Sequence, residues 1–413
     1  MGIPLGAAKG SSVQAPRLPW TLLSISLALV MMDGYDMFIV SFVAPLLTKE
    51  LHFGLKGIGS VFAAGLAGSM VGGLLLGSLA DRLGRRPLVL AALAAAGLTT
   101  LLGSQAQSVG VFIAMRFLTG LSLGGLLAVL VPLVAEHFPR GQRNTAVTVM
   151  FVGYPLGAVV GGAITALLLM HGWRHLFLGA GIVTLLLLPM ALTLPETLDP
   201  AAVSLQRADR KSWRWTVTDL FSEGRLWTTI LGSIAILSLL LVSYLLNSWI
   251  PLIAANDGFS PKTAVWCGVL LNLGGVLGAL GSTWLAAKFG VFKVVTSMLA
   301  IGSLAVMLLG ELFGSAGALY GGLALVGVLV IGGQQNAPTI SVLLYPQRMR
   351  GSGVGWQFAA GRLGSILGPL IGGGLLAAKV PIPLLFVMIG VPVLLAAAAY
   401  LAAGMLRLRH AAE

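Results

Sequence analysis

Two aspartates, Asp33 and Asp36, lie within an apolar run near the start of the chain, VMMDGYDMFIV at 30–40. A spacing of three residues places both carboxyl groups on one face of a helix. In hydrocarbon an ionised carboxylate is costly unless it is paired, hydrated or protonated. Burial and a like-charged neighbour both favour the protonated form, so at least one aspartate is expected to take up and release a proton. The alternative is a packing pair satisfied by hydroxyl groups or backbone.

Two arginines, Arg116 and Arg362, also lie inside long apolar runs. By its depth Arg116 can meet Asp33 or Asp36, either as a structural ion pair or as a pair whose breaking and remaking is a coupling step. Arg362 lies near the middle of its run, and a guanidinium group binds a carboxylate through two parallel hydrogen bonds. We therefore expect Arg362 to be the main partner of a small organic anion, with a packing role as the alternative.

Polar side chains also gather in apolar runs of the second half. The candidates for lining a substrate path are Asn247, Trp249, Asn272, Gln334, Gln335 and Asn336. Pro338 frees backbone groups next to the last three, which membrane proteins tolerate where a cavity is lined. Any one of these side chains can instead bridge helices. Tyr35 and Trp356 can stack on an aromatic ring, although aromatic residues at helical spacing also serve packing.

The elements that position these residues are membrane spans. Of the 413 residues, 57% are hydrophobic and 9% are charged, with a mean hydropathy of +0.97, whereas soluble proteins carry about 25% charged residues. A span needs about 20 mostly apolar residues. Twelve stretches qualify: 20–47, 57–80, 87–105, 109–136, 143–170, 175–194, 226–254, 261–286, 292–312, 316–344, 353–377 and 382–405. We therefore predict an all-α membrane protein with twelve transmembrane helices.

The distribution of positive charge predicts the orientation. With the N-terminus inside, 18 of the 25 Lys and Arg residues fall in cytoplasmic segments and five fall outside, as the positive-inside rule requires. Both termini are therefore expected in the cytoplasm, and the net charge of +12 calls for no nucleic-acid partner. The predicted domains are a tail at 1–18, a six-helix bundle at 19–197, a linker at 198–225, a second six-helix bundle at 226–406 and a tail at 407–413.

The two halves repeat a glycine pattern. GYPLGAVVGG at 153–162 and GSILGPLIGG at 364–373 share the form GxxxG[AP]xxGG and lie about half the chain apart. Two related bundles around a midplane site are the plan of a transporter. The sequence holds no GxxxxGK[ST] phosphate loop, no His/Cys cluster and no nucleophile constellation. We therefore expect no ATP drive, no cofactor, no metal and no enzymatic activity.

Several segments resemble one transporter superfamily. GSLADRLGRRP at 77–87 is similar to the GxLxDRxGR[KR] signature loop of the major facilitator superfamily, and RFLTGLSLGG at 116–125 is similar to its fourth-span pattern. Within that superfamily, DGYD at 33–36, YLLNSWIP at 244–251 and the segment 345–364 resemble the aromatic acid/H⁺ symporter family. The resemblance covers nearly the whole chain. It implies two pseudo-symmetric bundles and the import of a benzoate-like or related carboxylate with protons.

The resemblance also implies residues that control access from the cytoplasm. A loop carboxylate can pair with nearby cations and a helix N-terminus and so hold one state closed. The expected gating residues are Asp81, Arg82, Arg85, Arg86, Glu136, Arg140 and Arg350. The equivalent loop of the second half has Ala287 where the family often keeps an aspartate, so the second latch is expected to be weaker.

These features predict a proton-coupled symporter that imports a small aromatic or related organic carboxylate by alternating access. Its other partners are protons and the lipid bilayer of a bacterial inner membrane, where it is expected to act as a monomer. Asp33, Asp36 and Arg116 are assigned to proton coupling, and Arg362 to the substrate. The rivals are a proton-coupled antiporter that exports organic compounds, whose signature resembles GxxxG[AP]xxGG, and an uncoupled facilitator or sensor.

Overall fold

The computed structural model is almost entirely helical and describes residues 18–52, 54–139, 142–195, 220–222, 225–346 and 349–412. Twelve helices in this part of the chain are long and apolar enough to cross a membrane. Each predicted span overlaps one of them, and the ends differ by a few residues. The predicted all-α fold with twelve spans is confirmed. Most of the predicted linker lies outside the described residues.

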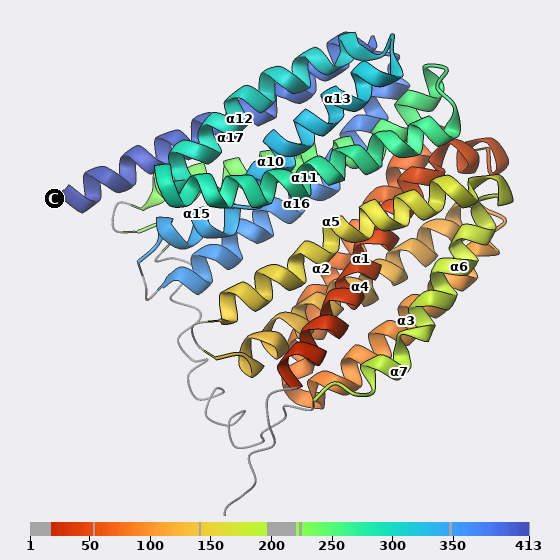
Figure 1. The fold of residues 1–413 in the computed structure, drawn as a ribbon, viewed down its shortest axis with the longest axis horizontal. Coiled ribbons are helices and arrows are strands. Elements are labelled where there is room, and N and C mark those ends of the chain that lie inside the picture. The colour runs from red at the N-terminus through yellow and green to blue at the C-terminus, as the bar shows by residue number, and fades with distance from the viewer. Residues whose placement is uncertain are drawn as a thin grey trace, which may run out of the picture.

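The helices form two bundles (Figure 1). The first consists of α1 (Leu18–Glu50), α2 (Leu55–Leu83), α3 (Arg85–Ser104), α4 (Val109–His137), α5 (Arg143–Leu168), α6 (Trp173–Leu186) and α7 (Leu188–Ala191). The second consists of α10 (Leu226–Asn256), α11 (Pro261–Phe289), α12 (Val291–Leu308), α13 (Ala316–Val326), α14 (Gly332–Gln334), α15 (Ala337–Leu344), α16 (Arg350–Ala377) and α17 (Ile382–Ala412).

The tenth span is broken into short pieces. A π-helical turn, Gly327–Ile331, joins α13 to α14, and Pro338 lies in the first turn of α15. Proline supplies no backbone N–H and is suited to the first turn of a helix. The break therefore falls at the polar run around Gln334, as the position of Pro338 indicated.

Glycines bring the helices of each bundle into close contact. A Cβ atom at Gly72 of α2 would lie 1.8 Å from the carbonyl oxygen of Leu121, and one at Gly120 of α4 would lie 2.0 Å from the carbonyl oxygen of Gly65. In the second bundle, a Cβ at Gly364 of α16 would lie 2.1 Å from the carbonyl oxygen of Leu237. Small residues permit such approach in membranes, where van der Waals contact drives association.

The two bundles meet mainly along three helix pairs, α2 with α16, α5 with α11, and α1 with α10, and α1 also contacts α11. Close contacts lie toward the end of the molecule where α1 ends and α2 begins, which we call the distal end. There a Cβ at Gly59 would lie 3.1 Å from the carbonyl oxygen of Pro369, and the ring of Phe62 packs edge-on against Trp249 at 5.7 Å. The distal end is therefore closed by contact between the bundles.

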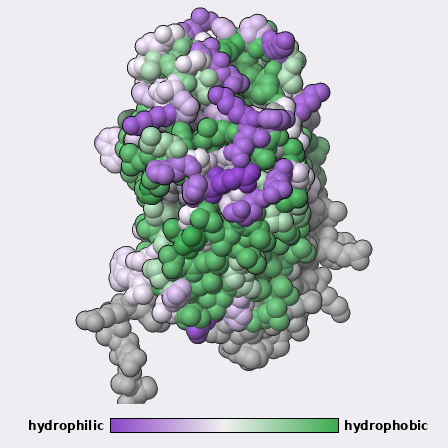
Figure 2. Space-filling view, turned by 90° about the vertical axis from the view of Figure 1, so that its right-hand side faces the viewer, coloured by the Kyte–Doolittle hydropathy of each residue, from purple (hydrophilic) through white to green (hydrophobic). Residues whose placement is uncertain are grey.

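The surface fits a molecule surrounded by lipid. Leu74, Leu167 and Leu186 are each about two-thirds exposed, which is costly in water but favourable in hydrocarbon. Viewed from the right-hand side of Figure 1, hydrophilic residues gather across the middle of the face and reach its upper part, and hydrophobic side chains predominate below them (Figure 2). The chain is a multi-pass membrane protein.

Candidate functional site

Asp36 and Arg116 form a buried ion pair between α1 and α4. Nη2 of Arg116 lies 3.0 Å from Oδ2 of Asp36, and Nη1 donates to Oδ1 at 3.1 Å. Nη2 also donates to the backbone carbonyl of Asp36 at 2.9 Å, and the hydroxyl of Thr100 on α3 donates to Oδ1 at 3.3 Å. Both residues are 3% exposed. Asp36 is thus neutralised by a two-point contact with a fixed cation.

The surroundings of Arg116 hold its side chain in place. A Cβ at Gly65 of α2 would lie 3.7 Å from Nη2, in ordinary van der Waals contact, so α2 packs directly beside the guanidinium group. The ring centroid of Phe177 lies 6.0 Å from the guanidinium carbon on the α6 side. Nε of Arg116 has no hydrogen-bond partner within the described part of the chain. The pair is therefore enclosed by three helices of the first bundle besides its own two.

Asp33 lies one turn earlier on α1 and differs from Asp36 in its partners. It is 7% exposed, and no ion pair joins it to another described residue. It lies within electrostatic reach of Asp36, Arg116 and Arg362. Of the two aspartates, Asp33 is the one whose carboxyl group is buried without a neutralising contact.

Arg362 faces the first bundle from the second. It is half-buried on α16, and its Nη1 donates to the hydroxyl of Ser69 on α2 at 3.5 Å. Among the described residues, no carboxylate lies within ion-pairing distance of it. The structure therefore brings Arg362 into the electrostatic neighbourhood of Asp33 and leaves its guanidinium group without an anionic partner.

Two phenols meet between the bundles at the same level. The hydroxyl oxygens of Tyr154 on α5 and Tyr244 on α10 lie 3.3 Å apart. Tyr154 also packs edge-on against Phe38 at 5.7 Å and interacts electrostatically with Asp33 and Arg362. Sequence reasoning did not anticipate this pair, because its two members lie far apart in the chain and nothing local links them.

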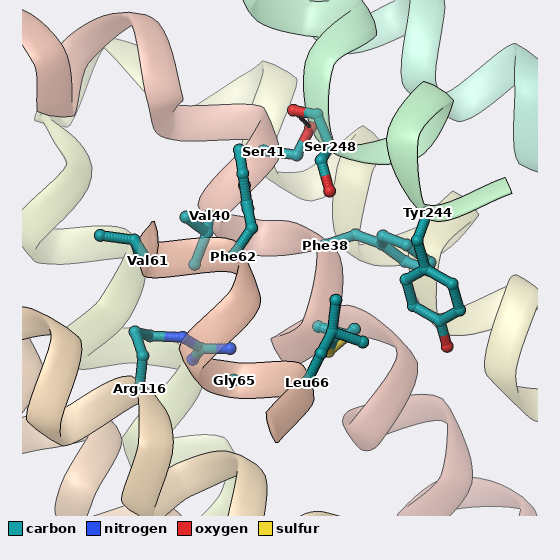
Figure 3. A pocket seen from close by; sticks show the side chains of 11 residues that line it. Phe38, Val40, Ser41, Val61, Phe62, Gly65, Leu66, Arg116, Tyr244 and Ser248 are labelled. Carbon is teal, nitrogen blue, oxygen red and sulfur yellow. Dashed lines mark hydrogen bonds between the residues drawn. The ribbon is translucent and has the colours of Figure 1, made fainter. Parts of the chain in front are cut away.

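A small cavity opens between α1, α2, α4 and α10 (Figure 3). In that view Phe38 and Tyr244 lie side by side, and Arg116 lies on the other side of the space from them. Its lining residues are Met37, Phe38, Val40, Ser41, Val61, Phe62, Gly65, Leu66, Arg116, Tyr244 and Ser248. The wall is mainly apolar with a few polar groups, and the cavity volume of about 10 Å³ has room for about one water molecule in this state.

Amides of the second bundle form a buried chain of hydrogen bonds. The amide nitrogen of Asn272 donates to the side-chain oxygen of Asn247 at 2.7 Å, and the amide nitrogen of Asn247 donates to the carbonyl of Ser243 at 2.8 Å. The hydroxyl of Ser243 donates to Gln334 on α14. Three of the predicted path residues are thus linked into one network across α10, α11 and the broken tenth span.

The other predicted path residues lie elsewhere. Asn336 donates to Ser282 at 2.8 Å, and Gln335 is exposed. Trp249 is fully buried and donates from Nε1 to the carbonyl of Pro369 at 3.0 Å. Their roles in binding stay predictions.

Tyr35 and Trp356 do not face the space between Asp33 and Arg362. The hydroxyl of Tyr35 lies 3.2 Å from that of Thr165 on α5, and a Cβ at Gly161 would lie 1.9 Å from the Tyr35 ring. Trp356 is 39% exposed and packs edge-on against Phe221 at 5.2 Å. Stacking of a substrate on either ring stays a prediction.

The expected gating residues are only partly described. Arg85 at the start of α3 forms an ion pair with Glu136 at the end of α4 through both of its terminal nitrogens. Arg350 begins α16 and donates from Nε to the carbonyl of Tyr345 at 3.4 Å, while Arg86 is half-buried. Arg140 and the side chains of Asp81 and Arg82 lie outside the described residues. The Arg85–Glu136 pair joins two helices of one bundle.

The candidate site consists of charged and hydrogen-bonding side chains. Within the described part of the chain, no group of three or more His, Cys, Asp or Glu residues is placed to hold a metal ion. What the site brings together is an unpaired carboxyl group, an unpaired guanidinium group and two phenols between two helical bundles.

Comparison with known proteins identifies the family of the chain. Residues 26–369 match the Major Facilitator Superfamily. The chain belongs to this superfamily. It is 32% identical to a gallate transporter of Pseudomonas putida, over 94% of this chain and 93% of that protein. It is 31% identical to the 4-hydroxybenzoate transporter PcaK of Pseudomonas aeruginosa, over 94% and 92%.

Within the superfamily the chain belongs to the aromatic acid/H⁺ symporter family, as these relatives show. Solved structures support the fold. A bacterial homologue of the human lysosomal transporter Spinster, inward-facing and occupied, matches with a TM-score of 0.77 at 15% identity, covering 95% of this chain and 98% of that one. A D-xylose–proton symporter matches with a TM-score of 0.76 at 15% identity, over 93% and 97%. This major facilitator protein is a transporter and not an enzyme.

Proposed function

We propose that this transporter imports a small aromatic carboxylate together with protons by alternating access. The observation that carries the proposal is the difference between the two aspartates. Asp36 is neutralised by Arg116, whereas Asp33 is buried within electrostatic reach of Arg362 and has no ion-pair partner among the described residues. A buried carboxyl group beside an unpaired arginine suits the joint binding of a proton and an organic anion.

Asp33 is the proton site in this mechanism. When Asp33 is protonated it carries no charge, so the positive charge of Arg362 is available to a substrate carboxylate. When Asp33 loses its proton, its own carboxylate attracts Arg362 and weakens the hold on the substrate. Proton release therefore promotes substrate release, which is the coupling that symport requires.

The charge balance of transport depends on the number of protons carried. One carboxylate carried with one proton moves no net charge, and each additional proton would add about 2.3 kcal/mol of drive per 100 mV. Asp36 and Arg116 neutralise each other's charge in this state. Their part is to fix α1 against α4, so that Asp33 keeps its orientation toward Arg362.

The names of the relatives support the substrate class. They include transporters of gallate, 4-hydroxybenzoate, benzoate and gentisate, all of which are aromatic carboxylates. The bacterial sources of these relatives favour the inner membrane. We further propose that the distal end faces outward and the termini lie in the cytoplasm, since the charge bias requires it, and that the protein acts as a monomer.

The direct test is transport by purified protein in liposomes. With an outside pH below the inside pH, labelled benzoate or 4-hydroxybenzoate is expected to enter at an initial rate well above that of protein-free liposomes, which take up the neutral acid by diffusion, and a proton ionophore should abolish the protein-dependent uphill uptake. Adding substrate without a gradient should carry protons inward. Failure to transport any aromatic acid, or accumulation that the ionophore leaves unchanged, would refute proton-coupled import.

The GxxxG[AP]xxGG motif supports an exporting antiporter less well than it supports close helix packing. Gly157 and Gly161 on α5 face α1, where Cβ atoms would lie 1.9 Å from the carbonyl oxygen of Met31 and from the ring of Tyr35, respectively. Close helix packing therefore accounts for both glycines. Outward proton movement on adding substrate outside would favour exchange, and substrate equilibration without proton flux would favour an uncoupled facilitator.

A further inference from the structure

A side-chain hydroxyl of the first bundle donates a hydrogen bond to the backbone of the second bundle. The hydroxyl of Ser41 on α1 donates to the carbonyl of Asn247 at 2.5 Å and lies 3.0 Å from the carbonyl of Ser248, both on α10. Ser41 is 1% exposed. A helical serine commonly bonds a carbonyl of its own helix, as Ser24 does with Trp20 at 2.9 Å. Ser41 instead bonds the other bundle.

Pro251 explains why a carbonyl is available there. It lies inside α10, four residues after Asn247. A proline has no backbone N–H, so the carbonyl four residues earlier loses its helical partner. An unpaired backbone carbonyl is costly in a membrane interior. The Ser41 hydroxyl supplies the donor that Pro251 removes.

The bond lies among the contacts that close the distal end. A Cβ at Gly268 of α11 would lie 2.8 Å from the ring of Phe42, the residue after Ser41. Trp249, on the same turn of α10, packs against Phe62 of α2. Because Ser41 and Asn247 belong to different bundles, the bond can exist only while the bundles are together at this end.

We propose that Ser41 is a gating residue, which stabilises the state with a closed distal end by capping the carbonyl that Pro251 leaves unpaired. The proposal rests on the alternating-access function given above. When the bundles separate at the distal end, water entering the opening replaces the Ser41 hydroxyl at the Asn247 carbonyl. The closed state alone therefore depends on Ser41, and removing the hydroxyl shifts the equilibrium toward the open state.

The test measures the distance between the bundles at the distal end. Spin labels are placed at Lys56→Cys and Ala378→Cys, at the exposed ends of α2 and α16, with the buried Cys267 replaced by serine. In the full-length protein in liposomes, Ser41→Ala should raise the population of the longer distance about threefold or more, since one buried hydrogen bond is lost. Ser41→Thr should keep the parent distribution, and so should the control Ser24→Ala.

A second pair of variants isolates the role of Pro251. Pro251→Ala restores an N–H at that position, so the Asn247 carbonyl gains a helical partner and Ser41 becomes dispensable. Ser41→Ala should then change the distance distribution much less in the Pro251→Ala background. An unchanged distribution in Ser41→Ala, or an equal shift in both backgrounds, would overturn the proposal. The distances report the open and closed populations without a transport assay. A protein that shows the expected change in distance but transports no aromatic acid would therefore refute the proposed function, while the proposed role of Ser41 would stand.

Discussion

Arg116 contacts Asp36 at three points, through both carboxylate oxygens and the backbone carbonyl. Asp33, one turn away, has no ion pair with any residue that the structure describes. Two carboxyl groups on one helical face thus occupy different electrostatic situations. The first consequence concerns stability. Breaking a buried ion pair by removing one partner leaves an uncompensated charge.

Asp36→Asn is therefore expected to destabilise the protein by about 3–5 kcal/mol, because it leaves Arg116 buried and unpaired. The double variant Asp36→Asn with Arg116→Gln should recover much of this loss, since no buried charge remains. Thermal unfolding in detergent measures both. Equal unfolding temperatures for the single and double variants would argue against a neutralising pair.

Asp33→Asn should leave folding nearly unchanged and remove proton coupling, because Asp33 has no ion-pair partner among the described residues to lose. We expect uphill accumulation of an aromatic acid in liposomes to disappear. Exchange of labelled for unlabelled substrate should persist, since it needs no net proton movement. Accumulation at the parent level in Asp33→Asn would assign the proton to another group.

Arg362→Lys is expected to raise the KM for an aromatic carboxylate about tenfold, because a lysine cannot offer two parallel hydrogen bonds to a carboxylate. Arg362→Ala should raise it further. Lys293→Ala, which removes an exposed positive charge at the start of α12, is the matched control. Parent-like affinity in Arg362→Ala would exclude the arginine as the anion's partner.

The sequence anticipated the groups on single helices better than the contacts between bundles. Asp33, Asp36, Arg116 and Arg362 were recognisable because a charge in an apolar run is exceptional wherever the chain folds. The partner of Arg116 was left open, since depth alone could not decide between Asp33 and Asp36. The Tyr154–Tyr244 and Ser41–Asn247 contacts depend on how two bundles dock, and no local periodicity encodes that. The contact of Trp356 with Phe221 likewise depends on tertiary placement, and stacking of a substrate on Trp356 stays a prediction.

The phenol pair predicts a specificity effect. The Tyr154 and Tyr244 hydroxyls lie 3.3 Å apart in the neighbourhood of Asp33 and Arg362, where a ring hydroxyl of a bound acid can join them. Tyr154→Phe and Tyr244→Phe should each reduce the preference for 4-hydroxybenzoate over benzoate about tenfold, because a site built to bind a hydroxyl discriminates through it. Tyr400→Phe is the control, since its buried hydroxyl has no partner among the described residues. Unchanged ratios of kcat/KM would remove the phenols from substrate recognition.

The glycine contacts between α2 and α4 hold α4, which carries Arg116, in position. The last prediction concerns these contacts. A Cβ at Gly72 would lie 1.8 Å from the backbone oxygen of Leu121, and backbone cannot swing aside as a side chain can. Gly72→Ala should therefore cost about 1–3 kcal/mol through overpacking, measured as a lower unfolding temperature. Gly179→Ala on α6 has nothing within 4 Å of the new Cβ, so it should be neutral or stabilise the helix by up to about 1 kcal/mol. If both variants unfold at the same temperature, close packing at Gly72 is not what binds α2 to α4, and the placement of Arg116 must depend on other contacts of α4.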